Sequence, residues 1–388
     1  MSKLPLRIAV AGANGFIGKS HVQDILNEDD AELAALIDND PSIASTAKQH
    51  GVASFADLQE FLSAYKAGDL KANAIILATP THTHIPMAES LVGSGLTVLI
   101  EKPLAPTGDE GRKFLEICKA DTNGTYMVGH HRRHNCYVRA IKDVLDKNEL
   151  GRVVAVNGVW AQRKSEQYFS IPWHQQVGSG GVLLTNAIHE MDMLQYWLGN
   201  IEEVHAIEGP KERPFPVDST VQVTMKFASS VIGSFLFTDV ASSHLSWEAG
   251  TGDVGVFPAT GEDFLTIFGT KGSISVPSLT RYHYGTRPDA EQNWNYSLEK
   301  DTTPQEWVDN KTSFSHQLKH FIATARGEAS PNCSIDDGLR AVFVIEAVHD
   351  SLRNAQSLNA FTKRKHLIMI AQYAVLTEIW NDLEMLRV

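Results

Sequence analysis

The first 26 residues place a short apolar run, a glycine-rich turn and a helix-forming segment in immediate succession. Residues 6–11 (LRIAVA) have the composition of a buried strand, glycines follow at Gly12, Gly15 and Gly18, and residues 19–26 have helical spacing. In this context glycines let the backbone approach a pyrophosphate closely, and a helix N-terminus favours the negative charge. The spacing is G-x-x-G-x-x-G rather than the usual G-x-G-x-x-G, so the turn alone is a weak signal.

A second apolar run strengthens the dinucleotide interpretation. Residues 33–37 end in Asp38, which lies twenty residues after Gly18. An acidic side chain there accepts hydrogen bonds from the adenosine ribose hydroxyls, whereas its charge repels a 2′-phosphate. Asn39 and Asp40 supply no cation for such a phosphate. The sequence therefore favours NAD over NADP, and the alternative for Asp38 is a helix cap ahead of Pro41.

Strand and helix patterns keep alternating up to residue 129. This alternation is typical of a doubly wound parallel sheet, in which ligands bind beyond the carboxyl ends of the strands. The further predicted strands are residues 52–55, 74–78, 96–100 and 125–129, and the predicted helices are residues 41–50, 56–62, 85–92 and 107–120. The loops at residues 12–18, 79–84 and 101–103 then lie at the ligand-binding edge.

The third of these loops is the motif Glu101-Lys102-Pro103. By itself, a charged pair at the end of a strand indicates a solvent-exposed surface. Its position after a strand of the nucleotide-binding sheet places Lys102 beside the cofactor instead.

Beyond residue 129 the pattern changes to one dominated by strands. The alternation in residues 221–227 (VQVTMKF) is typical of an antiparallel sheet with one solvated face. A chain of 388 residues suits two domains. The predicted elements are a helix at residues 136–147, strands at 153–161, 203–208, 219–227, 231–239 and 264–268, and closing helices at 314–326 and 335–354.

We therefore expect an α/β Rossmann doubly wound domain at residues 1–129 and an α+β substrate and oligomerisation domain, with a large, mostly antiparallel open sheet, at residues 130–360. Residues 361–388 form a C-terminal extension of uncertain order, containing a helix-like apolar stretch after Lys363-Arg364-Lys365. Packing on the subunit, contacts between subunits, loose order and a membrane-surface helix all remain open for it.

Composition excludes several classes of protein. The net charge of −12 argues against a nucleic-acid binder, and no run reaches the roughly 18 apolar residues of a membrane span. Residues 1–5 lead almost directly into the first strand, which predicts no signal peptide. Cys118, Cys136 and Cys333 are odd in number and far apart, as reduced thiols are, and they have no metal-site spacing. We expect a cytoplasmic protein without nucleic-acid or membrane partners and without a bound metal.

Several motifs together resemble the Gfo/Idh/MocA oxidoreductases, the group of glucose–fructose oxidoreductase and inositol dehydrogenase. They are the glycine turn, residues 78–84 (ATPTHTH) and the Glu-Lys-Pro motif, followed by residues 178–192 (GSGGVLLTNAIHEMD) and residues 267–274 (IFGTKGSI). The resemblance extends to about residue 360. It implies an NAD-dependent oxidoreductase with a large open sheet in its second domain, and a homodimer or homotetramer. The expected cofactor-binding residues are Gly12, Asn14, Gly15, Phe16, Ile17, Gly18, Asp38, Thr79, Pro80, Thr81, His84, Glu101 and Lys102.

The chemistry at the substrate is expected from residues 182–197, which have helical spacing. Asn186 and His189 are three residues apart and so share a helical face. A histidine can exchange a proton with a hydroxyl near neutral pH, and an amide can hold a sugar hydroxyl. The resemblance places the family's catalytic histidine at His189; the alternative is a core histidine paired with a carboxylate such as Asp192. The family commonly has an aspartate four residues earlier, where this chain has Thr185, so an Asp–His pair is not predicted.

Oxidation of a secondary alcohol requires loss of a hydride from carbon and of a proton from oxygen. Lys102 supplies a cation and a hydrogen-bond donor for the developing alkoxide, and His189 is the expected general base. Which of the two takes the proton first stays open. A bound cationic nicotinamide would also lower the pKa of Lys102.

Further candidate substrate ligands are Tyr168, Trp173, Asn186 and His131. Trp173 has a core position as its alternative, and His174 stands where many relatives have an arginine. His131 belongs to the basic run at residues 130–134 (HHRRH), for which a solvated face and a site for an acidic substrate are the two interpretations. A metal site there is disfavoured because no carboxylate or cysteine completes it.

The function expected from the sequence is that of an NAD-dependent dehydrogenase or reductase acting on a secondary alcohol or ketone of a sugar, cyclitol or related hydroxy ring. One alternative is a non-catalytic dinucleotide-dependent sensor, because a fold alone does not determine function. Another is a glycoside-cleaving enzyme that uses tightly held NAD. Retention of both Lys102 and His189 favours the dehydrogenase.

Overall fold

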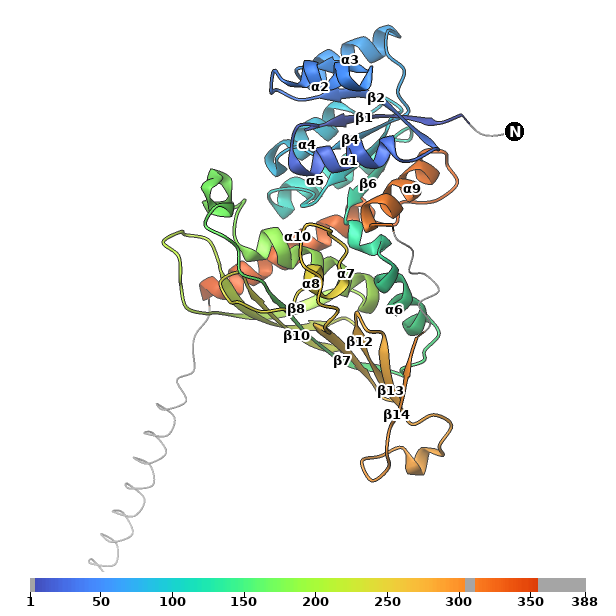
Figure 1. Cartoon of the computed structure of the whole chain (residues 1–388), viewed down its shortest axis with the longest axis vertical. Coiled ribbons are helices and arrows are strands. Elements are labelled where there is room, and N and C mark those ends of the chain that lie inside the picture. Colours follow the sequence, from blue (N-terminus) through green and yellow to red (C-terminus); the bar gives the residue numbers. More distant parts are fainter. Residues whose placement is uncertain (1–3, 304–310, 355–388) are drawn as a thin grey trace, which may run out of the picture.

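The computed structural model describes residues 4–303 and 311–354 and contains two sheets, one above the other in Figure 1. The extension expected at residues 361–388 lies outside the described residues. Among the described residues, none of the helices is long and apolar enough to cross a membrane.

The first sheet is parallel, as the alternation of strands and helices predicts. Its strands are β1 (Leu6–Ala11), β2 (Ala31–Ile37), β3 (Ala53–Phe55), β4 (Ala74–Leu77), β5 (Thr97–Glu101) and β6 (Thr125–Gly129). Its helices are α1 (Phe16–Leu26), α2 (Ile43–His50), α3 (Leu58–Ala67), α4 (Thr81–Ser90) and α5 (Gly108–Ala120). The strand order is β3-β2-β1-β4-β5-β6, so the order reverses between β1 and β4. The loops after these two strands therefore flank the crevice in which such sheets bind ligands.

Two boundaries in this domain differ from the prediction. Helix α4 begins at Thr81, four residues earlier than expected, because its first turn is polar and carries no apolar periodicity. Strand β5 includes Glu101, which the sequence placed in the following loop. The start of α4 now lies directly after the loop at β4, and Glu101 lies inside the sheet.

The strands of the first sheet are mostly apolar because both of its faces are buried. In β1, Ile8 and Val10 pack into one hydrophobic core, whereas Ala9 and Ala11 pack into the other. This double burial explains why the parallel strands have no polar alternation in the sequence.

The second sheet has eight strands. They are β7 (Val153–Ala161), β8 (Ile201–Glu208), β9 (Thr220–Phe227), β10 (Ile232–Thr238), β11 (Leu265–Gly269), β12 (Gly272–Val276), β13 (Thr280–His283) and β14 (Glu299–Thr302). Their order is β14-β13-β12-β11-β7-β10-β9-β8, and all neighbours are antiparallel except β7 and β10. The predicted large, mostly antiparallel sheet is confirmed.

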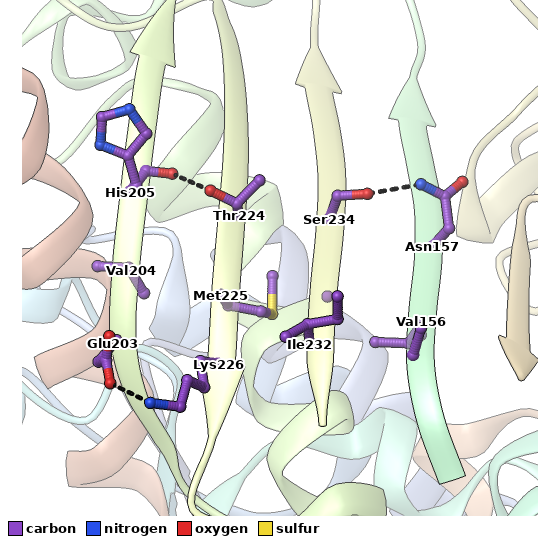
Figure 2. A pocket seen from close by; sticks show the side chains of 12 residues that line it. Val156, Asn157, Glu203, Val204, His205, Thr224, Met225, Lys226, Ile232 and Ser234 are labelled. Atoms are coloured by element: carbon purple, nitrogen blue, oxygen red, sulfur yellow. Dashed lines mark hydrogen bonds and ion pairs between the residues drawn. The ribbon is translucent and has the colours of Figure 1, made fainter. Parts of the chain in front are cut away.

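One face of the second sheet is covered and the other is open. Helices α6 (Cys136–Asp146), α7 (Ile188–Leu198) and α10 (Ile335–Asn354) lie on the side toward the first sheet (Figure 1). On β9, Val223 and Met225 are buried beneath them, whereas Thr224 and Lys226 are exposed. Figure 2 shows the open face across β8, β9, β10 and β7, where Asn157 donates a hydrogen bond to Ser234 and the exposed Ile232 lies further along β10.

After the second sheet is complete, α9 (Ser313–Ala325) returns to the first sheet, and α10 packs on β8 and α7 as well as on α5 and β6. On α9, Leu318, Phe321 and Ile322 belong to the same core as Ile8 and Val10. The loop between α9 and α10 also contacts β6, because the Val128 N–H donates to the Cys333 carbonyl at 2.9 Å. The two sheets are thus held together by C-terminal helices as well as by the chain between β6 and β7.

Candidate active site

The glycine turn after β1 is packed too tightly for any side chain at two of its positions. Gly12 has φ +77°, and a Cβ atom there would lie 2.3 Å from the Ala78 carbonyl oxygen. A Cβ atom on Gly18 would lie 2.0 Å from the Gly12 oxygen. Helix α1 begins after Gly15 without a side-chain cap and without an acidic residue in its first turn. The turn and the uncapped N–H groups fit the pyrophosphate of a dinucleotide.

Asp38 lies at the end of β2, directly beside this turn. Its carboxylate accepts hydrogen bonds from the Asn14 N–H at 2.9 Å and the Asp40 N–H at 3.0 Å. The Ser42 N–H, at the start of α2, bonds to Asp40 rather than to Asp38. The helix-cap alternative for Asp38 is therefore wrong, and its position suits the ribose of NAD.

Other predicted cofactor residues lie at the same edge of the sheet. Phe16, the first residue of α1, is 71% exposed, and Ile17 is half-buried behind it. Thr79 and Pro80 form the loop after β4, and Thr81 begins α4. Their contacts with NAD remain predictions.

His84 connects two of the three loops. Its Nδ1 atom lies 2.8 Å from the Pro103 oxygen, and its Nε2 atom lies 2.8 Å from the Thr79 oxygen. The side chain is buried, which lowers its pKa. His84 thus lies between the loops after β4 and β5, and its contact with NAD remains a prediction.

Glu101 turns inward from the end of β5. Its Oε1 atom lies 2.8 Å from His21 Nε2 on α1, and its Oε2 atom accepts the Lys102 N–H at 3.1 Å. Burial alone raises the pKa of Glu101, but the hydrogen bond and charge of His21 hold that pKa below its ordinary value. A Cβ atom on Gly129 would lie 2.9 Å from Glu101 Oε1, so β6 needs a glycine there. Glu101 is buried rather than on the surface, and it anchors the backbone of Lys102. Its expected contact with NAD remains a prediction.

Lys102 reaches from the first domain to the second. Its Nζ atom lies 3.4 Å from the carbonyl oxygen of Thr185. Burial lowers the pKa of Lys102 to about 8, with Arg132 and Lys164 acting in the same direction and Glu101 opposing them. The side chain is thus a cation at neutral pH that lies within about one unit of losing its proton.

His189 lies in the first turn of α7 and is 7% exposed. Its ring centroid lies 5.0 Å from that of His131 and 6.1 Å from that of His130. Burial, followed by the charges of Lys102 and Arg132, lowers the pKa of His189 well below its ordinary value. The imidazole is therefore neutral at pH 7 and able to accept a proton.

The basic run forms the short helix η1 (His131–His134) and is buried, so the solvated-face interpretation is wrong. Arg132 bonds to Glu190 and, at 2.9 Å, to Glu248. Arg133 binds Asp192 at 2.7 Å. The acidic-substrate interpretation is also wrong for these arginines, because protein carboxylates already neutralise them. Because Asp192 binds Arg133, it is not the partner of His189 that the core-histidine alternative required.

His131, an expected substrate ligand, packs against His189, and its contact with substrate remains a prediction. Its ring stacks on Phe314 with centroids 4.1 Å apart and meets His189 edge to face. Burial lowers the pKa of His131 well below its ordinary value. The ring is thus a neutral spacer between α9 and the proposed base.

Thr185 and Asn186 lie in the π-helix η4 (Leu183–Ala187), which precedes α7. The Thr185 Oγ1 atom is 2.8 Å from Asn186 Oδ1 and 2.6 Å from the Gly181 oxygen, and it accepts a bond from Lys164 Nζ at 2.9 Å. A π-turn widens the helix, so the i, i+3 face predicted for Asn186 and His189 is not regular here. Lys164 was not predicted; its only sequence signal is its position three residues after β7.

Tyr168 and Trp173 lie in the short helices η2 (Tyr168–Ser170) and η3 (Pro172–Gln175). Tyr168 stacks on His174 at 3.7 Å, and Lys164 Nζ lies 4.7 Å from its ring centroid. Burial raises the pKa of Tyr168 to about 12, so this phenol is a hydrogen-bond donor rather than a base. Trp173 is 48% exposed, and the core alternative for it is wrong.

Within the described ranges, no group of three or more histidine, cysteine or acidic side chains is arranged to hold a metal ion. The polar groups of Lys102, Thr185, Asn186 and His189 converge at the junction of the two domains.

Comparison with known proteins identifies both halves of the chain. Residues 6–130 match the family model described as an oxidoreductase family NAD-binding Rossmann fold. Residues 142–359 match the oxidoreductase family C-terminal alpha/beta domain.

Similar curated proteins include the inositol 2-dehydrogenase of Rhizobium meliloti, which is 24% identical over 92% of this chain and 99% of that protein. The levoglucosan dehydrogenase of Pseudarthrobacter phenanthrenivorans is 28% identical over 43% of this chain, a match that spans only 49% of that enzyme. Among solved structures, the WlbA dehydrogenase of Bordetella pertussis, in complex with NADH and UDP-GlcNAcA, has a TM-score of 0.71 at 21% identity, covering 91% of this chain and 97% of that one. The scyllo-inositol dehydrogenase of Lactobacillus casei, with bound NAD(H) and scyllo-inositol, has a TM-score of 0.68 at 19% identity, covering 90% and 97%.

Proposed function

Because the chain belongs to the Gfo/Idh/MocA oxidoreductase family, we propose that it is an NAD-dependent dehydrogenase or reductase for a secondary alcohol or ketone of a sugar, cyclitol or related hydroxy ring. The observation that carries this proposal is the meeting of Lys102, from the nucleotide-binding domain, with the Thr185 carbonyl just before the neutral His189 of the second domain. A sensor needs a dinucleotide site, but it has no need for a cation and a neutral base at the same junction.

His189 and Lys102 have different roles at the reacting oxygen. His189 takes the hydroxyl proton, since its imidazole is uncharged at pH 7. Lys102 holds the oxygen by a charge-assisted hydrogen bond that strengthens as alkoxide character develops. In the reductive direction His189 returns the proton to the oxygen. Bound NAD supplies the acceptor for the hydrogen on carbon.

Asp38 and the glycine turn would hold the adenosine half of this cofactor. The Asp38 carboxylate accepts two backbone N–H bonds, which hold it beside the glycine turn. A charged carboxylate at the ribose favours NAD over NADP.

The proposed substrate class is supported by the names of similar proteins. Inositol 2-dehydrogenases and a levoglucosan dehydrogenase are similar to this chain in sequence. Their names support a hydroxylated ring as substrate, and Asn186, Tyr168 and Trp173 provide polar and aromatic groups that suit one.

The open face of the second sheet is the proposed subunit interface. Ile207 and Ile232 are 60% and 58% exposed on this face, and Phe268 is 41% exposed. We expect a homodimer or homotetramer in the cytoplasm. Light scattering on the purified protein tests the oligomer, and Ile232→Glu should weaken it.

The experiment that tests the function is a screen of NAD and NADP reduction against sugars, polyols and cyclitols. We expect oxidation of at least one hydroxylated ring, with NAD preferred. NAD binding without turnover of any compound would support the sensor instead. Product formed from a glycoside without added NAD would support the glycoside-cleaving alternative.

A further inference from the structure

Two lysine ammonium groups converge on one uncharged residue at the domain junction. Lys102 Nζ lies 3.4 Å from the Thr185 carbonyl oxygen, and Lys164 Nζ lies 2.9 Å from the Thr185 hydroxyl. Thr185 is uncharged, so its side chain places no negative charge between the two ammonium groups.

The charge of Lys164 is only partly balanced elsewhere. Its nearest carboxylate oxygen is Asp239 Oδ2 at 3.4 Å, and this buried oxygen has no hydrogen-bond partner among the described residues. Arg213 takes the other oxygen and the carbonyl of Asp239. One buried carboxylate thus faces two cations, while the ammonium group of Lys164 directs its hydrogen bond to Thr185.

The next carboxylate, Asp218, is also occupied. Its Oδ1 atom accepts the Leu183 N–H at 2.7 Å, and its Oδ2 atom lies 3.2 Å from His349 Nε2. The other groups around Lys164 are aromatic: its Nζ atom lies 5.7 Å from the Trp160 ring and 4.7 Å from the Tyr168 ring. These rings restrict the lysine to the direction of Thr185 without neutralising it.

Lys164 also lies close to the reacting groups. Its charge lowers the pKa of Lys102, and Thr185 is followed directly by Asn186 and, three residues later, by His189. The Lys164 side chain is 12% exposed, and this burial lowers its pKa, an effect that the charge of Asp239 opposes. A charge-assisted bond to an anion is strengthened by such desolvation.

We propose that Lys164 binds a carboxylate of the substrate, and that Thr185 permits this by leaving Lys102 and Lys164 without a negative charge between them. The substrate would then be a sugar acid whose carboxylate lies near the oxidised hydroxyl. A carboxylate suits the site better than a phosphate, because Arg213 bonds to a carboxylate oxygen and to the carbonyl of Asp239, which leaves one cation, Lys164, whose charge Asp239 balances only in part. The carboxylate binds and does not react. This inference rests on the dehydrogenase function proposed above.

The test compares each sugar with its own uronic acid, for example glucose with glucuronate and galactose with galacturonate, using the full-length protein and NAD. We expect kcat/KM to be at least tenfold higher for the acid. Lys164→Met should reduce the acid-to-neutral ratio at least tenfold, mainly through KM, whereas Lys164→Arg should retain part of it. Thr185→Asp should invert the preference. Lys113→Met removes an exposed lysine on α5 of the first domain and is the matched control, with the ratio unchanged.

Calorimetric titration of the uronate into the protein with NADH provides a second readout that does not need turnover. Uronate binding that is lost in Lys164→Met supports the inference even if no compound is oxidised, in which case the proposed reaction fails instead. Oxidation of neutral sugars without binding or oxidation of uronates overturns the inference and leaves the reaction standing. An acid-to-neutral ratio that Lys164→Met leaves unchanged overturns it as well.

Discussion

Replacing Gly12 by alanine tests whether the glycine turn is built for a close backbone approach. At φ +77° the new Cβ atom would lie 2.3 Å from the Ala78 oxygen, where real contacts stay beyond 3.0 Å. The left-handed backbone alone costs an alanine ~1–2 kcal/mol. The contact adds to this cost, because either the turn after β1 or the loop after β4 must move by several tenths of an ångström. Both loops flank the proposed cofactor crevice.

Gly51→Ala is the matched control for this change. Gly51 has φ +68° at the end of α2, and a Cβ atom there would meet nothing within 4 Å. Urea unfolding should therefore show a loss of ~1–2 kcal/mol for Gly51→Ala and a larger loss for Gly12→Ala. Fluorescence titration should show NAD binding at least tenfold weaker in Gly12→Ala and unchanged in Gly51→Ala. Normal NAD affinity in Gly12→Ala would refute the reasoning.

Three further predictions follow from the site. Asp38→Ala should weaken NAD binding more than NADP binding in parallel titrations, whereas Asp40→Ala should keep the preference; an unchanged ratio in the first variant contradicts the role of Asp38. The pKa of Lys102 is about 8, so kcat/KM measured against pH should fall as the pH rises through about 8 and the cation is lost, and a flat profile from pH 7 to 9 would count against it. Arg132→Met leaves Glu190 and Glu248 buried without their partner, which should cost ~3–5 kcal/mol in urea unfolding. Because burial already raises the pKa of Glu190 to about 7, that deficit should be largest above pH 7 and shrink as the pH falls and the Glu190 carboxylate takes up a proton.

The first domain was predictable because its signals are local. Apolar strands, polar turns and the glycine spacing each report on residues that are neighbours in the chain, and the parallel sheet follows from their alternation. The position of Lys102 at the crevice also follows, since it comes directly after a strand of that sheet. The inward turn of Glu101 does not follow, because its partner His21 is 80 residues away.

The interpretations of the basic run at residues 130–134 were wrong for the same reason, because the partners of its arginines are distant in the sequence. Local sequence offers no carboxylate, but Glu190, Asp192 and Glu248 reach these arginines from α7 and α8 (Trp247–Thr251). The π-turn at Thr185 was also missed, since a helix with one widened turn has nearly the same apolar pattern as a regular one. Lys164 belongs to no recognisable motif. Its proposed role follows only from the fold, which brings its ammonium group and that of Lys102 to Thr185.

The most direct test of the central claim is the activity and NAD affinity of Lys102→Met, with Lys113→Met, an exposed lysine on α5, as control. The substrate is any compound that the wild-type protein oxidises in the sugar and cyclitol screen. We predict that turnover falls by about a hundredfold or more while the Kd for NAD stays within about threefold, because Lys102 acts at the reacting oxygen rather than in holding the dinucleotide. Turnover close to that of Lys113→Met would contradict the account.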